Sequence, residues 1–182
     1  MGQDRSLARG LRLAISLLFA VAVAAPASAE KLTFDHRNHP GLKAVLDGGD
    51  PGMIDFDASN PRYVVDLIAV KGRSARDWTE ALEIIARTPT GKIRTARDWA
   101  AEIQGGAVAG CNPAVTTLAE DAISITFERL APACPAARAE TMITRIVQGK
   151  RSLFLLSVLV KGVPDAGSRQ QWLALLESAH LD

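Results

Sequence analysis

The sequence predicts an α+β fold, with a mostly antiparallel β-sheet flanked by helices and one disulfide. Three observations lead to this prediction. Two segments near the C-terminus, Thr141–Gln148 and Leu153–Val160, have the apolar and β-branched composition of paired strands. Apolar residues at helical spacing follow several predicted strands. The chain of 182 residues contains two cysteines, Cys111 and Cys134.

The N-terminal residues have the plan of a secretory signal peptide. Three arginines precede an apolar segment, residues 13–25, and Ala27-Ser28-Ala29 is a small-residue cleavage site. We therefore expect residues 1–29 to be removed by cleavage between Ala29 and Glu30, and the protein to be periplasmic or secreted. An uncleaved anchor helix is the alternative, but the apolar segment is short for a bilayer span.

The remaining chain, residues 30–182, has the length of one α+β domain with a substantial core. It contains 18 basic and 19 acidic residues, a net charge of −1. No basic stripe indicates a nucleic-acid partner, and no polybasic segment indicates binding to anionic lipid. After signal cleavage we expect no stable transmembrane segment. The expected partners are an envelope protein or a small ligand.

The two C-terminal segments are predicted to form a β-hairpin at the centre of the sheet. Gly149-Lys150 offers a two-residue turn with Gly first, the preference of a type II′ hairpin turn. Alternate residues of Leu153–Val160 are apolar on both faces, so both faces should be covered. A buried helix is the alternative for such a short run. The glycines on either side, Gly149 and Gly162, limit its length and favour a strand.

The segment before this hairpin begins with short elements. We expect residues 31–34 to form a first strand, residues 35–41 a polar loop, and residues 42–46 a helical turn that ends at Gly48-Gly49. Residues 50–61 are rich in Asp, Gly, Pro and Asn and are predicted to form a loop.

A strand at residues 63–70, with Asp66 inside it, is predicted to lead into a helix. Ser74 is the expected N-cap and Asp77 lies three residues later, the spacing of a capping box. The apolar face of this helix follows the i, i+3, i+4, i+7 spacing and comprises Trp78, Ala81, Leu82 and Ile85. Residues 88–91 end it.

The same local pattern occurs three times. Thr95 and Ser168 begin segments that resemble the one at Ser74, and each candidate N-cap precedes a tryptophan by four residues. We expect three helices packed on the sheet through Trp78, Trp99 and Trp172. The alternative is an aromatic ligand platform. The second helix should end at Gly105-Gly106, and the third should run from Ser168 to about Leu181.

Two further strands are predicted between the second helix and the hairpin, at residues 115–120 and 122–130. In the second, Ile123, Ile125 and Phe127 alternate with polar residues, the pattern of a strand exposed to water on one side. In an exported chain, Cys111 and Cys134 are expected to form one disulfide. A reactive thiol or metal pair is the alternative, but the two cysteines lie far from C-x-x-C spacing.

The order of elements resembles the PsbP-like fold of secreted α/β/α sandwich proteins. The resemblance covers roughly residues 62–182. It lies in YVVDLIAV followed by SARDWTEALEIIAR, and in QGKRSLFLLSVLVKG followed by QQWLALLESA. It implies a binding or accessory role in the cell envelope, with no catalytic site to carry over.

The densest polar cluster of the sequence is Asp35-His36-Arg37-Asn38-His39. Asp35, His36 and His39 are the types of residue that bind Zn²⁺ or act in acid–base catalysis. Their spacing matches no H-E-x-x-H motif, and Asn38 and Pro40 are typical of a turn. We therefore predict no metal site, no catalytic residue and no cofactor. A loop with Asp55 and Asp57 lacks the remaining EF-hand ligands.

The sequence favours a non-enzymatic periplasmic or secreted binding or accessory protein. The alternative is a small metal-dependent hydrolase that uses Asp35, His36 and His39. The structure can discriminate between them, because an enzyme should place His36 or His39 beside carboxylates in a cleft. A binding protein should leave both histidines on an open turn.

Overall fold

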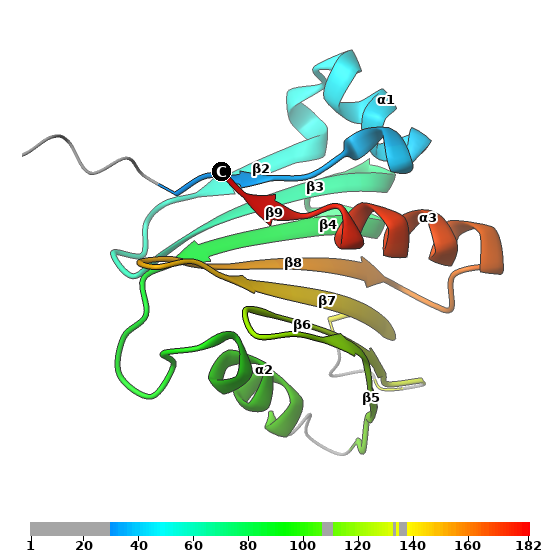
Figure 1. The fold of residues 1–182 in the computed structure, drawn as a ribbon. Coiled ribbons are helices and arrows are strands. Elements are labelled where there is room, and N and C mark those ends of the chain that lie inside the picture. The colour runs from blue at the N-terminus through cyan, green and yellow to red at the C-terminus, as the bar shows by residue number, and fades with distance from the viewer. Residues whose placement is uncertain (1–29, 107–110, 133, 135–137) are drawn as a thin grey trace, which may run out of the picture.

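The computed structural model describes residues 30–106, 111–132, 134 and 138–182. The predicted signal peptide therefore lies outside the described residues. Within them the fold is α+β, as predicted, with a seven-stranded antiparallel sheet, a two-stranded sheet and three α-helices (Figure 1).

The large sheet has the strand order β2-β3-β4-β8-β7-β6-β5. The central strand is β8 (Leu153–Val160), and all eight of its residues are buried, which confirms the prediction of a covered central strand. Its neighbours are β7 (Thr141–Gln148) and β4 (Asp77–Arg87). The outer strands are β3 (Tyr63–Ser74), β2 (Ile54–Asp57), β6 (Ser124–Leu130) and β5 (Ala114–Glu120).

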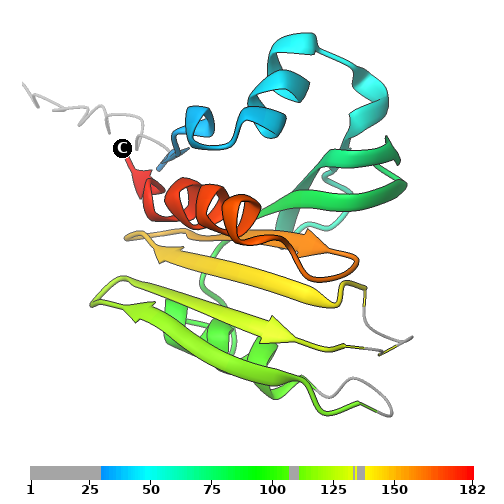
Figure 2. The same ribbon diagram turned by 90° about the vertical axis from the view of Figure 1, so that its right-hand side faces the viewer.

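Helices cover both faces of this sheet (Figure 2). α1 (Pro40–Gly48) and α3 (Ala166–Glu177) pack on one face, and α2 (Ala96–Gly105) packs on the other. Two short 3₁₀ helices, η1 (His36–Asn38) and η2 (Pro51–Met53), flank α1 in the chain. The two-stranded sheet joins β1 (Leu32–Thr33) to β9 (His180–Leu181) and so brings the two ends of the described chain together.

The core divides between the two faces. On the α1/α3 face, Leu42 of α1 and Trp172 of α3 pack against side chains from the central strands, such as Leu82 and Leu156. On the α2 face, Trp99 packs with Phe127 and neighbouring residues. A smaller cluster around Trp78 lies at the other end of that face. The sheet therefore forms the middle layer between two apolar cores.

The predicted helix after Ser74 is wrong, because residues 77–87 form strand β4. Ser74 pairs with Asp77 across a two-residue loop. The hydroxyl of Ser74 accepts the amides of Arg76 and Asp77, a local bond that serves a turn as well as a helix N-cap. Leu82 faces one core and Ala81 the other. Tertiary pairing with β3 and β8 therefore overrides the helical spacing.

Trp78 consequently lies on a strand and not on a helix. It is nonetheless buried, as are Trp99 on α2 and Trp172 on α3. All three rings thus belong to the packed interior, which agrees with structural roles and not with a surface platform. Thr95 and Asp98 form the complete capping box of α2, as the sequence predicts. The N-cap of α3 is Asp165 and not Ser168.

Three smaller predictions also need correction. The hairpin loop between β7 and β8 contains four residues, Gly149–Ser152, and not a two-residue turn, since Gln148 pairs with Leu153. The predicted loop at residues 50–61 contains η2 and the edge strand β2. In β6, Ser124 and Thr126 are buried, and their hydroxyls bind Asp121 and Arg145. That face of β6 is not exposed to water.

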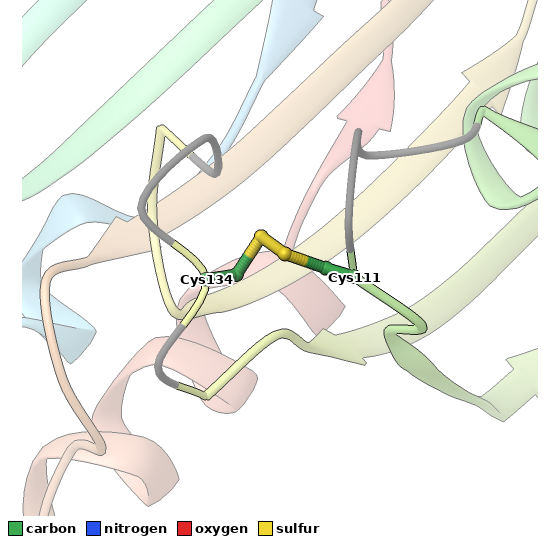
Figure 3. The surroundings of a disulfide bond; sticks show 2 residues. All are labelled: Cys111 and Cys134. Atoms are coloured by element: carbon green, nitrogen blue, oxygen red, sulfur yellow. A yellow bond between two sulfur atoms is a disulfide. The ribbon is translucent and has the colours of Figure 1, made fainter.

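Cys111 and Cys134 form the predicted disulfide (Figure 3). It joins the segment before β5 to the segment after β6, beside the Ala114–Leu130 pair that begins this ladder. The seven residues of β5 are exposed at the edge of the sheet. This strand therefore has little buried surface of its own, and the crosslink restricts its separation from β6.

Replacing both cysteines by serine is expected to lower the free energy of unfolding by about 2–5 kcal/mol, because the crosslink restricts the unfolded chain. Denaturant unfolding of the oxidised protein and of the double variant measures the difference. Alkylation without reductant should label neither cysteine in the native protein. Free labelling of both would contradict the pairing.

Candidate functional site

The polar loop at residues 35–39 does not form one site. Asp35 is the N-cap of η1 and binds the guanidinium of Arg37. These hydrogen bonds from Arg37 lower the pKa of Asp35 to about 2. His36 lies within η1, whereas His39 is turned inward and is only 4% exposed. The expectation that both histidines lie on an open turn is therefore wrong for His39.

His39 is held by contacts on both sides of its ring. Its Nδ1 accepts the amide of Leu42 at 3.0 Å and so caps α1. Its ring stacks on Trp172, with centroids 3.7 Å apart. Because Nδ1 accepts a hydrogen bond, the proton of the neutral ring is on Nε2. Nε2 faces a carboxylate oxygen of Glu80 at 3.7 Å, too long for a direct hydrogen bond.

Glu80 of β4 is the centre of this buried cluster and is 3% exposed. Its carboxylate accepts the indole N–H of Trp172 and the hydroxyl of Ser168, and it pairs with Lys71. Burial acts to raise the pKa of Glu80, but His39, Lys71 and Trp172 outweigh it and lower the pKa to about 2. The carboxylate is therefore ionised and well supplied with donors.

The His39–Glu80 pair resembles part of a catalytic dyad, but its geometry supports a structural role. A general base needs an available nitrogen lone pair, and that of His39 is occupied by the Leu42 amide. The pair is also packed against Trp172 of α3, and both side chains are buried. Among the described residues, no group of three or more His, Cys, Asp or Glu side chains is placed to hold a metal ion.

The strongest candidate for a binding site lies elsewhere on the same face of the sheet. A groove of about 530 Å³ runs between the N-terminal segment, residues 30–34, and strands β3, β4 and β8. In Figure 1 this segment is the blue chain that leads through β1 toward η1. The side chains that line the groove are Glu30, Lys31, Leu32, Phe34, Val64, Asp66, Ile84, Ala86 and Phe154.

The register of the sheet explains why these residues meet. Val64 pairs with Ala86, and Ala86 pairs with Phe154 on the next strand. Asp66 pairs with Ile84 in the same way, so all five side chains point to the α1/α3 face. α1 and α3 cover the other end of that face, which leaves this end open beneath the N-terminal segment.

Exposed apolar side chains extend from the groove to the edge of the sheet. Val64 is 37% exposed, and Phe56 on the edge strand β2 is 62% exposed. Phe56 pairs directly with Asp66, so its ring is on the same face as the groove. Clustered exposed apolar side chains of this kind are typical of interaction sites.

Asp66 is the one charged residue on the sheet surface of the groove. Among the described residues it has no hydrogen-bond or ion-pair partner, and its cross-strand neighbours are Phe56 and Ile84. Burial raises the pKa of its carboxyl group above the usual value. A partly buried carboxylate among apolar side chains is costly for stability and marks a site that can bind a ligand.

A second cavity, of about 750 Å³, lies beside the Gly149–Ser152 loop and is more polar. Glu30 lines both cavities, and its carboxylate accepts the amides of Lys150 and Arg151. Burial acts to raise the pKa of Glu30, but these hydrogen bonds lower it overall. The carboxylate of Glu30 is therefore already engaged in hydrogen bonds to the Gly149–Ser152 loop. The apolar groove remains the better candidate, because it combines apolar walls with an unpaired charge.

No local sequence pattern indicates this groove. Asp66 stood out only as an acidic residue within a β-branched strand, and no role was assigned to it. The groove requires residues from three strands and from a segment at least 30 positions away in the sequence. Comparison with known protein families and with curated proteins finds no match for this chain.

Proposed function

We propose that this chain is a non-enzymatic binding or accessory protein of the cell envelope, and that its ligand binds in the groove between residues 30–34 and strands β3, β4 and β8. The observation that supports the proposal is an open apolar groove with one unpaired carboxylate. Its volume is in the range of small-molecule sites, and its walls are largely preformed by a rigid sheet.

Two features support a location outside the cytoplasm. The N-terminal residues have the composition of a signal peptide, and the two cysteines are joined in a disulfide, which is typical of oxidising compartments. Of the helices in the described part of the chain, none combines the length and the apolar character needed to cross a bilayer.

The arrangement of an antiparallel sheet between helices is compatible with the proposed resemblance to PsbP-like proteins, which is an analogy at the level of fold. The segment SARDWTEALEIIAR, one of the four that support it, is a turn and strand in this chain. The proposal of a binding role therefore rests on the groove. The hydrolase alternative has no such support, since the lone pair of His39 is engaged in capping α1.

The proposal predicts that Val64→Ser weakens binding of a neutral apolar probe. N-phenyl-1-naphthylamine, whose fluorescence rises in apolar surroundings, should bind the wild type at one site. Loss of about one buried methylene equivalent costs about 0.8 kcal/mol, which corresponds to a roughly fourfold higher Kd.

Val163→Ser is the matched control, because Val163 is 77% exposed and lies outside the groove. It should leave the Kd unchanged. The thermal midpoints of both variants separate loss of binding from loss of folding. If the probe does not bind, or if both variants affect it equally, the groove is not the binding site.

A further inference from the structure

We infer that the ligand of the groove carries a protonated amine on an apolar body, and that its ammonium group pairs with Asp66. This inference rests on the proposed function and specifies the chemical class of the ligand. It follows from the charge that the groove presents and from a comparison of the half-buried Asp66 with the buried Glu80.

Asp66 and Glu80 lie on the same face of the same sheet but have opposite surroundings. Glu80 is supplied with donors from Lys71, Ser168 and Trp172. Asp66 has none among the described residues, although it lies in the interior of a strand. An ionised carboxylate in apolar surroundings without a partner destabilises a fold. A ligand that supplies the missing cation would remove this cost when it binds.

The other charged groups near Asp66 do not supply that cation. The carboxylate of Glu30 faces the Lys150 and Arg151 amides. Lys31 lines the groove from the N-terminal segment, but it is exposed and forms no ion pair with Asp66 in the described part of the chain. On the edge strand, Asp55 and Asp57 alternate with Phe56 and therefore point to the opposite face.

The chemistry of the groove also argues against other ligand classes. A carboxylate or phosphate on the ligand would repel Asp66 in surroundings of low polarity. A metal ion needs several ligands, and no group of three suitable side chains occurs in the described residues. A purely apolar ligand would leave the carboxylate desolvated and unpaired. In a ligand with an amine on an apolar body, the body can pack against the apolar side chains of the groove and the ammonium group can pair with Asp66.

The inference predicts the order of affinity for three compounds with the same ten-carbon chain. By titration calorimetry below micelle-forming concentrations, decylamine should bind the wild type about tenfold or more tightly than decanol, as expected for a charge-assisted hydrogen bond. Decanoate should bind most weakly. The advantage of decylamine should decrease as the pH is lowered through the pKa of Asp66, because the protonated carboxyl group no longer carries the charge.

The variant Asp66→Asn tests the role of the charge, and Asp55→Asn is its control on the opposite face of the adjacent strand. Asp66→Asn should weaken decylamine binding until its preference over decanol is lost, and it should raise the thermal midpoint of the free protein, because an unpaired charge is removed. Asp55→Asn should retain the preference. If decanol binds and decylamine has no advantage, this inference is wrong and the proposed function stands. If none of the three compounds binds, both are wrong.

Discussion

Replacing Glu80 by alanine is expected to lower the free energy of unfolding by about 2–4 kcal/mol, because it leaves buried hydrogen-bond donors without an acceptor. The substitution leaves Lys71 without its partner and leaves the indole N–H of Trp172 and the hydroxyl of Ser168 without an acceptor. It also removes the hydrogen bonds that join β4 to α3. Urea unfolding, followed by tryptophan fluorescence, measures the change.

Two variants calibrate this result. Glu80→Gln keeps the shape and an acceptor oxygen, so it should cost less than alanine. Glu102→Ala removes an exposed carboxylate on α2 and should change the stability by no more than about 0.5 kcal/mol. A loss below about 1 kcal/mol for Glu80→Ala would contradict the role given to this cluster.

The lowered pKa of Glu80 predicts how the stability of the protein depends on pH. The pKa of Glu80 is lowered to about 2 in the folded protein, from a reference value of 4.5. Its contribution to stability is therefore fully present above pH 4.5 and is lost as the pH falls toward 2. Asp66 affects stability in the opposite direction. Burial raises the pKa of its carboxyl group in the folded protein, so its ionisation at higher pH lowers the stability. In Glu80→Gln, the acid-induced loss of stability should be smaller.

The second large effect is expected for Trp172→Ala, which should lower the free energy of unfolding by about 3–5 kcal/mol. Trp172 is fully buried, and its ring stacks on His39 while its N–H binds Glu80. Trp172→Phe keeps an aromatic ring and should cost less. Since Trp172 and Glu80 are in contact, the double alanine variant should lose less than the sum of the single losses. Additive losses would show that the two residues act independently.

His39 belongs to the same cluster, and this changes an expectation drawn from the sequence, namely that a binding protein leaves both histidines on an open turn. The structure instead places His39 at the N-cap of α1 and against Trp172. The sequence contains the Asn-His-Pro signal of a helix start, but the partners of the ring lie 41 and 133 positions away, and no local pattern indicates them.

Two near-identical segments show where local sequence suffices and where it does not. Thr95-Ala-Arg-Asp-Trp99 starts a helix, and Ser74-Ala-Arg-Asp-Trp78 turns between two strands. In both, the first hydroxyl accepts an amide three residues later. What differs is the context, since residues 77–87 lie between β3 and β8 and have a covered surface on both sides. Where both faces are buried, the alternation typical of a strand disappears from the sequence.

The elements that were predicted correctly are those with a local cause. The β7–β8 hairpin is specified by two β-rich segments separated by a polar break. The disulfide follows from having only two cysteines in a chain whose sequence predicts export. The groove has no such local cause, because Val64, Ala86 and Phe154 become neighbours only through strand register.

The most direct test of the binding role is to map a neutral ligand onto the protein. Decanol titrated into ¹⁵N-labelled protein should shift the backbone amide signals of residues around the groove, such as Phe34, Val64 and Ile84, and leave those of α2 unchanged. Such a pattern would locate the ligand between the N-terminal segment and the sheet. Shifts concentrated on α2, or no saturable shifts at all, would contradict the assignment of this groove as the binding site.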